Sequence, residues 1–180
     1  MGWARMRIDA DAERSFTVPA ERLWPLVSIV HGYLDSIPEI VAYETDSPDR
    51  TAAFDGRLKV GPAVWSVPGS AAVTVVNPGC EVAVQLTVPK LVLGYEGVLA
   101  LRDLGAGAAR VSHRGTITCE HRMIGRLHFL LRQILTDHLD LFLTETIGQA
   151  ERAYRAEQAL LGRGGASHRR SSPRKPSATT

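Results

Sequence analysis

Cysteine is scarce in this chain of 180 residues, and its two cysteines, Cys80 and Cys119, stand far apart. Two cysteines are too few for a disulfide framework, and neither belongs to a C-x-x-C motif or to a Cys/His cluster with zinc spacing. The sequence therefore predicts no metal site. A reducing compartment suits such a chain, and we expect a cytoplasmic protein.

Long apolar runs and an export signal are also missing. The longest uncharged window, residues 60–80, is interrupted by Pro62, Pro68 and Pro78. It lacks the roughly 20 mostly apolar residues that a membrane-spanning helix needs. The first residues carry Arg5 and Arg7, but no apolar stretch of signal-peptide length follows them. Nothing here predicts export or a transmembrane segment.

Motifs that hold cofactors or activate nucleophiles are absent as well. The chain has no Gly-rich phosphate loop, no serine nucleophile elbow and no H-E-x-x-H pair. These absences argue against a cofactor-dependent enzyme, and we expect no cofactor. Whether the protein is an enzyme at all stays open, with a non-catalytic role favoured.

Charge of one sign is concentrated at a single place. The chain has 21 basic and 19 acidic residues, but residues 162–180 carry five basic side chains and no acid, which leaves about −3 on residues 1–161. A mildly acidic domain argues against nucleic acid as a partner. The segment 162–180, rich in Gly, Ser, Arg and Pro, is predicted to be a disordered basic tail. Such a tail could touch anionic lipid, which would give a peripheral membrane contact.

The domain, residues 1–161, begins with a strand and short helices. Residues 5–18 alternate weakly and end before Pro19, which favours an extended edge strand. Pro19 at a helix N1 position, an acid in the first turn and helically spaced apolar residues predict a short helix over residues 19–27. His31-Gly32 is expected to break it, with one further turn over residues 33–37.

From residue 40 the apolar pattern has period two, and turn residues interrupt it at regular intervals. Six strands are predicted, over residues 40–46, 51–60, 63–76, 81–88, 91–103 and 108–120. In the last strand one face carries Val111, His113, Gly115, Ile117 and Cys119, and this face must be turned to the core. After residue 120 the period becomes helical, and one amphipathic helix is predicted from about Ile124 to Ala159.

This order predicts an α+β fold of the helix-grip kind: a curved antiparallel sheet of about seven strands around a long C-terminal helix, with two short helices after the first strand. Two stretches also carry a resemblance. Residues 16–24 (FTVPAERLW) resemble the opening strand and proline-initiated helix of the START/Bet v 1-like (SRPBCC) superfamily, including its bacterial polyketide cyclase/dehydrase-like members. Residues 54–62 and 109–115 resemble the branch of that superfamily that is related to a subunit of carbon monoxide dehydrogenase.

The resemblance implies an apolar cavity between the sheet and the long helix. Proteins similar to this one bind lipids, quinones, polyketides or hormones there, and some cyclise or dehydrate the ligand while others carry it or regulate a partner. Function depends on the site and not on the fold, so the resemblance leaves the ligand open.

Polar residues expected to face that cavity are the candidates for chemistry. His138 lies near the centre of the apolar helix face, and His113 faces the same space from the last strand. A neutral imidazole there could orient a ligand carbonyl or shuttle a proton. The alternative is a core histidine that is hydrogen-bonded to a hydroxyl or a backbone carbonyl. No acid is expected to face inward beside them.

The favoured hypothesis is a non-catalytic binder or carrier of a hydrophobic small molecule. His113, His138 and Tyr95 would orient the ligand, and the apolar part of the site would be Phe54, Leu131, Leu135 and Phe142. One alternative is a polyketide cyclase or dehydratase that uses His113 or His138 for proton transfer. The other is an assembly or docking subunit for a redox enzyme, which the carbon monoxide dehydrogenase resemblance implies.

Overall fold

Seven strands form one antiparallel sheet in the computed structural model, which describes residues 6–46, 48–60, 62–120 and 128–167. The strand order is β1-β7-β6-β5-β4-β3-β2, so that β2 to β7 form a continuous meander and β1 pairs with β7. The strands are β1 (Met6–Phe16), β2 (Ile40–Thr45), β3 (Thr51–Val60), β4 (Ala63–Asn77), β5 (Glu81–Val88), β6 (Leu93–Gly105) and β7 (Ala108–Cys119). Every predicted strand is present, because alternation and turn residues mark a meander clearly.

Two short helices follow β1, as predicted, but their details differ. Helix α1 (Ala20–Val27) starts after Pro19, which lies at the N-cap in extended conformation and not at N1. Helix α2 (His31–Leu34) begins at the His31-Gly32 pair that was expected to act only as a breaker. Gly32 instead permits close packing, because a Cβ there would lie 3.1 Å from the carbonyl oxygen of Leu26.

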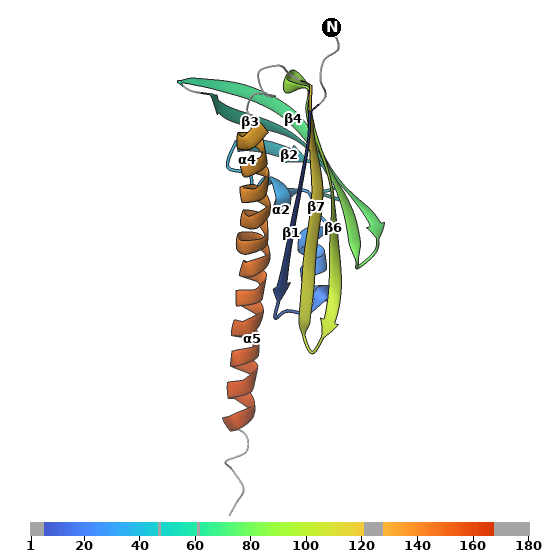
Figure 1. The fold of residues 1–180 in the computed structure, drawn as a ribbon. Coiled ribbons are helices and arrows are strands. Elements are labelled where there is room, and N and C mark those ends of the chain that lie inside the picture. The colour runs from blue at the N-terminus through green and yellow to red at the C-terminus, as the bar shows by residue number, and fades with distance from the viewer. Residues whose placement is uncertain (1–5, 47, 61, 121–127, 168–180) are drawn as a thin grey trace, which may run out of the picture.

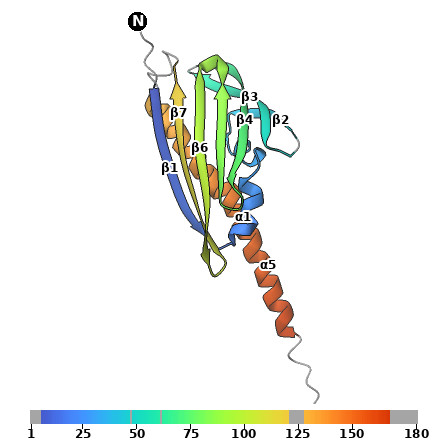
Figure 2. The same ribbon diagram turned by 90° about the vertical axis from the view of Figure 1, so that its right-hand side faces the viewer.

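A long C-terminal helix covers the concave face of the sheet (Figures 1 and 2). It consists of α4 (His128–Leu141), a π-helical segment η2 (Phe142–Ile147) and α5 (Gly148–Ser167). The apolar face was predicted, whereas the π-helical segment was not. The predicted start near Ile124 lies outside the described residues.

The last part of α5 runs past the end of the sheet (Figure 1), and Leu160 and Leu161 there are exposed. The predicted domain boundary at residue 161 therefore falls inside this helix. Residues 168–180 lie outside the described residues, and membrane contact by the basic tail stays a prediction. None of the described helices is both long and apolar enough to span a membrane.

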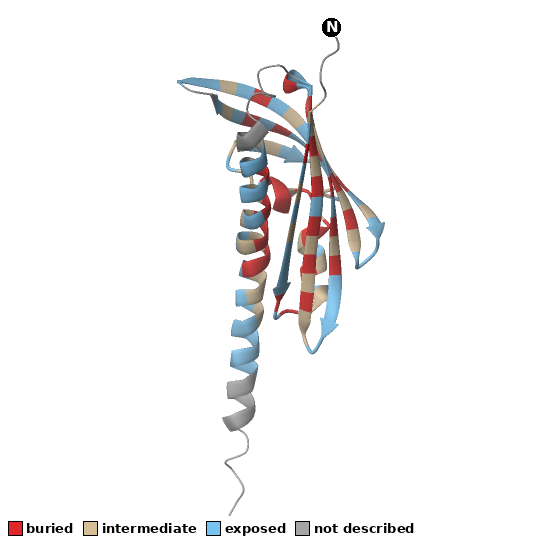
Figure 3. Ribbon diagram, viewed as in Figure 1, coloured by how far each residue is buried: buried red, intermediate tan, exposed pale blue. Residues whose placement is uncertain are grey.

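The core lies between the helix and the sheet, and buried residues follow the inner side of both (Figure 3). The five residues predicted for the inner face of β7 are all buried. On the helix the buried face is formed by Leu135, Leu139, Phe142, Leu143 and Ile147. The short 3-10 helix η1 (Pro89–Leu91), which precedes β6, adds Leu91 to the same core. The helix-grip fold is thus confirmed.

Candidate functional site

A cavity of about 200 Å³ lies between the sheet and the long helix. Its walls come from strands β3 to β7, from the η1 and α2 segments, and from α4 and η2. Most of the lining is aliphatic, including Leu58, Val67, Ala71, Val84, Leu91 and Leu139. The polar side chains in the wall are Tyr33, Ser36, Glu39, Gln85, Tyr95, His113 and His138.

Five of the seven predicted site residues line this cavity: Tyr95, His113, Leu135, His138 and Phe142. Phe54 is buried on the same face of the sheet but does not line the cavity. Its ring covers Gly69, where a Cβ would lie 2.4 Å from Phe54 Cζ. The side chain of Leu131 is not among those that the structure describes.

Tyr95 and His113 form a hydrogen-bonded pair on the cavity wall, with 2.7 Å between the Tyr95 hydroxyl oxygen and His113 Nε2. The pair depends on two glycines that face each other across β6 and β7, Gly97 and Gly115. A Cβ on Gly115 would lie 2.2 Å from the Tyr95 hydroxyl oxygen, and one on Gly97 would lie 2.4 Å from it. Glycine inside a strand often marks such a close approach, and both lie at inward positions, so the sequence contained this signal.

Burial keeps the imidazole of His113 neutral. Only 2% of the residue is exposed, and this burial lowers its pKa from 6.5 to about 4. Burial also raises the pKa of the Tyr95 hydroxyl. Nε2 of His113 is satisfied by Tyr95, whereas Nδ1 has no hydrogen-bond partner among the described residues. A buried polar atom without a partner is uncommon and calls for an explanation.

The depressed pKa of His113 predicts a loss of stability in acid. The unfolded chain takes up a proton near pH 6.5, while the folded chain resists it down to about pH 4. Above pH 6.5 His113 is neutral in both states, and its titration does not affect the free energy of unfolding. As the pH falls from 6.5 towards 4, only the unfolded chain is protonated at this residue, and the free energy of unfolding falls by about 3 kcal/mol in total. Urea unfolding of the wild type and of His113→Asn at pH 7 and pH 4.5 measures this difference. Parallel losses in the two proteins would contradict it.

Glu39 and His138 form a second polar pair in the wall. His138 Nε2 lies 3.0 Å from Glu39 Oε2, and this contact lowers the pKa of the Glu39 carboxyl, which is therefore ionised at neutral pH. The expectation that no acid faces inward is wrong at this position. Glu39 stands between Pro38 and the start of β2, in a connection without periodicity, and so no sequence pattern assigned it a direction.

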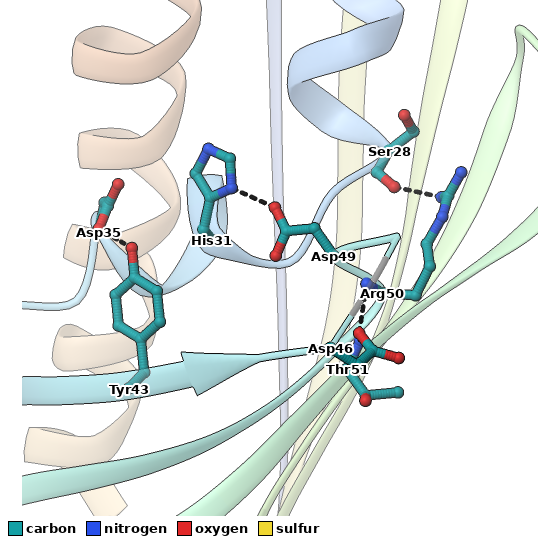
Figure 4. Close-up of polar contacts among 8 residues, drawn as sticks. All are labelled: Ser28, His31, Asp35, Tyr43, Asp46, Asp49, Arg50 and Thr51. Atoms are coloured by element: carbon teal, nitrogen blue, oxygen red, sulfur yellow. Dashed lines mark hydrogen bonds and ion pairs between the residues drawn. The ribbon is translucent and has the colours of Figure 1, made fainter.

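A polar cluster fixes α2, the helix that carries the cavity residue Tyr33 (Figure 4). His31 Nδ1 contacts the Asp49 carboxylate, and Arg50 donates to the carbonyl oxygen of Ser28. The Tyr43 hydroxyl donates to Asp35 at 2.6 Å. These contacts hold α2 and the residues on either side of it against β2 and the turn that follows β2.

Within the cavity, Tyr33 is fixed by its own contacts. Its hydroxyl donates to the Val27 carbonyl oxygen at 2.8 Å, and its ring stacks on Phe142 with 4.5 Å between centroids. The sequence could not show this stacking, because Tyr33 and Phe142 lie far apart in the chain and no spacing relates them.

A larger groove, of about 1190 Å³, crosses the outer face of β1, β7, β6 and β5. Its wall carries more polar groups than the wall of the inner cavity, and two of its charged groups, Arg7 and Asp9, pair with each other. Asp9 accepts hydrogen bonds from Arg7 at 3.1 Å and from Thr116 at 2.5 Å. The inner cavity, with its apolar wall and few polar groups, is the better candidate for a ligand site.

No protein-family model matches the chain, and no curated protein matches it at a significant level. Solved structures do match. Zhui aromatase/cyclase from Streptomyces sp. R1128 superposes with a TM-score of 0.63 at 16% identity, over 84% of this chain and 98% of that one. The chain has the START-like helix-grip fold. A START superfamily protein from Mycobacterium smegmatis gives 0.59 at 13% identity, over 81% of this chain and 98% of that one.

Truncated norcoclaurine synthase from Thalictrum flavum is a third match, with a TM-score of 0.54 at 12% identity over 78% of this chain and 94% of that one. Identities this low establish the fold alone, because one fold carries many activities. The resemblance to the carbon monoxide dehydrogenase branch, and the docking role that it implies, stay predictions.

Proposed function

We propose that this START-like protein binds or carries a hydrophobic small molecule in the cavity between its sheet and its long helix. The observation that supports this most is the apolar wall around about 200 Å³. An apolar cavity of about 150 Å³ is enough to bind benzene, while sites for drug-sized ligands start at about 300 Å³. Among lipids, quinones and polyketides, the volume therefore favours a compact ligand of one or two rings over a long chain.

The proposed site is formed by Tyr95, His113, Leu135, His138 and Phe142. Leu135 and Phe142 would supply apolar burial, which contributes about 25 cal/mol per Å² before the costs of binding. Tyr95 and the two histidines would orient the ligand. Phe54 is left out, since its ring packs on Gly69, and Leu131 stays a prediction.

Two measurements test this proposal. Native mass spectrometry of gently purified protein should detect a co-purified small molecule. Titration of stripped protein with 2-acetylnaphthalene should saturate at one site and raise the melting temperature. A probe present at 100 times its Kd stabilises the folded state by about 2.7 kcal/mol. The absence of a co-purified molecule, of saturation and of any thermal shift would reject the binding function.

A second candidate, a cyclase or dehydratase, is favoured by the Glu39–His138 pair. An imidazole next to a carboxylate can remove a proton from carbon beside a carbonyl, while the carboxylate orients the ring and stabilises the imidazolium. The test substrate is a short poly-β-ketone thioester, followed by mass spectrometry. A cyclase should form a cyclised or dehydrated product, and both His138→Ala and Glu39→Gln should slow it at least 100-fold. Turnover that neither change affects would remove this candidate.

A further inference from the structure

The unpartnered nitrogen of His113 carries information about the ligand, and the inference drawn from it rests on the binding function proposed above. Two hydroxyl groups of the wall are already engaged: the Tyr33 hydroxyl donates to the Val27 carbonyl oxygen, and the Ser36 hydroxyl donates to the Tyr33 carbonyl oxygen at 2.6 Å. Nδ1 of His113 is buried and has no hydrogen-bond partner among the described residues.

Whether that nitrogen is a donor or an acceptor depends on the tautomer. A neutral imidazole has one N–H and one bare nitrogen. A phenol is a stronger donor than a neutral imidazole, and a bare imidazole nitrogen is a stronger acceptor than a phenol oxygen. The 2.7 Å contact is therefore best made with the Tyr95 hydroxyl donating to Nε2, which leaves the ring hydrogen on Nδ1. His113, which lines the apolar cavity, then carries an unused N–H donor.

The charge of the ligand is limited by Glu39, which lines the same cavity and is ionised at neutral pH. An anion in the cavity would lose its hydration and face a like charge. We propose that the ligand is an uncharged molecule of one or two rings that carries a carbonyl oxygen, and that Nδ1–H of His113 donates to this oxygen. Such a contact would supply the partner that the buried donor lacks.

Three probes of nearly one shape test the proposal. In 2-isopropenylnaphthalene a methylene group replaces the carbonyl oxygen of 2-acetylnaphthalene, and 2-naphthoate adds a negative charge. Calorimetric titration at pH 7 should show the ketone binding about tenfold more tightly than the alkene, the factor that corresponds to about 1.4 kcal/mol. The naphthoate should bind more weakly than the ketone. His113→Leu should abolish the preference for the ketone, and His113→Asn, which keeps an N–H donor near the position of Nδ1, should retain it.

The tautomer is measured separately in the wild-type protein by ¹⁵N NMR of the imidazole, so that the proposal can be tested even if His113→Leu does not fold. The expected signals are a protonated Nδ1 and an unprotonated Nε2, with the Nδ1 signal shifting when the ketone binds. Equal affinities for ketone and alkene, or a protonated Nε2, would overturn this inference while leaving the binding function intact. If none of the three probes binds, the binding function itself fails for ligands of this size.

Discussion

Gly115→Val is expected to lower the free energy of unfolding by about 4 kcal/mol. A Cβ at this position would lie 2.2 Å from the Tyr95 hydroxyl oxygen and 2.5 Å from its ring carbon Cε2. The ring must therefore move, and overpacking of this kind costs about 1–3 kcal/mol. Its movement also breaks the hydrogen bond to His113 and leaves Nε2 buried without a partner, which costs a further 1–3 kcal/mol or so. Urea unfolding at pH 7 gives the difference.

The matched control is Gly94→Val in the same sheet. A Cβ there would meet only the Thr118 hydroxyl, at 3.2 Å, so the change should be small. A second control places Gly115→Val in a Tyr95→Ala background, where the clash is gone and the added side chain should cost less than about 1 kcal/mol. An equal loss at Gly94 and Gly115, or no rescue by Tyr95→Ala, would show that the close approach of Tyr95 to the sheet is not what requires glycine.

Ala71→Trp is expected to reduce the affinity for 2-acetylnaphthalene at least 100-fold. Ala71 is a small, buried residue of β4 that lines the cavity. An indole at this position would grow into the open space and occupy most of the volume that the probe needs. Because the side chain fills a cavity and does not enter packed core, the fold should tolerate it, and the free energy of unfolding should change by less than about 2 kcal/mol.

The neighbouring residue supplies the control, since successive side chains of a strand point to opposite faces. Ala72→Trp places the same side chain on the outer face of β4 and should leave the affinity within about threefold of the wild type. Calorimetric titration of both variants measures this, with circular dichroism to establish that each is folded. Undiminished binding to a folded Ala71→Trp variant would mean that the ligand binds elsewhere.

The sequence predicted the strands and their inward faces because both depend on local patterns. Alternation over residues 108–120 correctly assigned the buried face of β7, including His113. Helical periodicity likewise placed Leu135 and Phe142 on the buried face of the long helix. A repeating pattern reports which side of an element is covered, and for a meander under one helix this is enough to predict the architecture.

Contacts between distant residues could not be predicted in the same way. The Glu39–His138 pair joins a loop to a helix, and no spacing along the chain relates the two residues. The two inward glycines were visible in the sequence, but the approach of Tyr95 to Gly115 depends on the register of β6 and β7, which alternation alone does not give. Phe54 was assigned correctly to the inner face, but only the packing of its ring on Gly69 shows that it lies away from the cavity.

The central claim, that an apolar small molecule occupies the space between the sheet and the long helix, is tested most directly by isotope-filtered NMR with 2-acetylnaphthalene at saturation. Intermolecular NOEs are expected between the aromatic protons of the probe and the methyl groups of Val84 and Leu139, which line the cavity. None is expected to the exposed methyl groups of Val98 and Leu104. NOEs confined to those exposed positions, or no NOE to any cavity methyl group, would contradict the account.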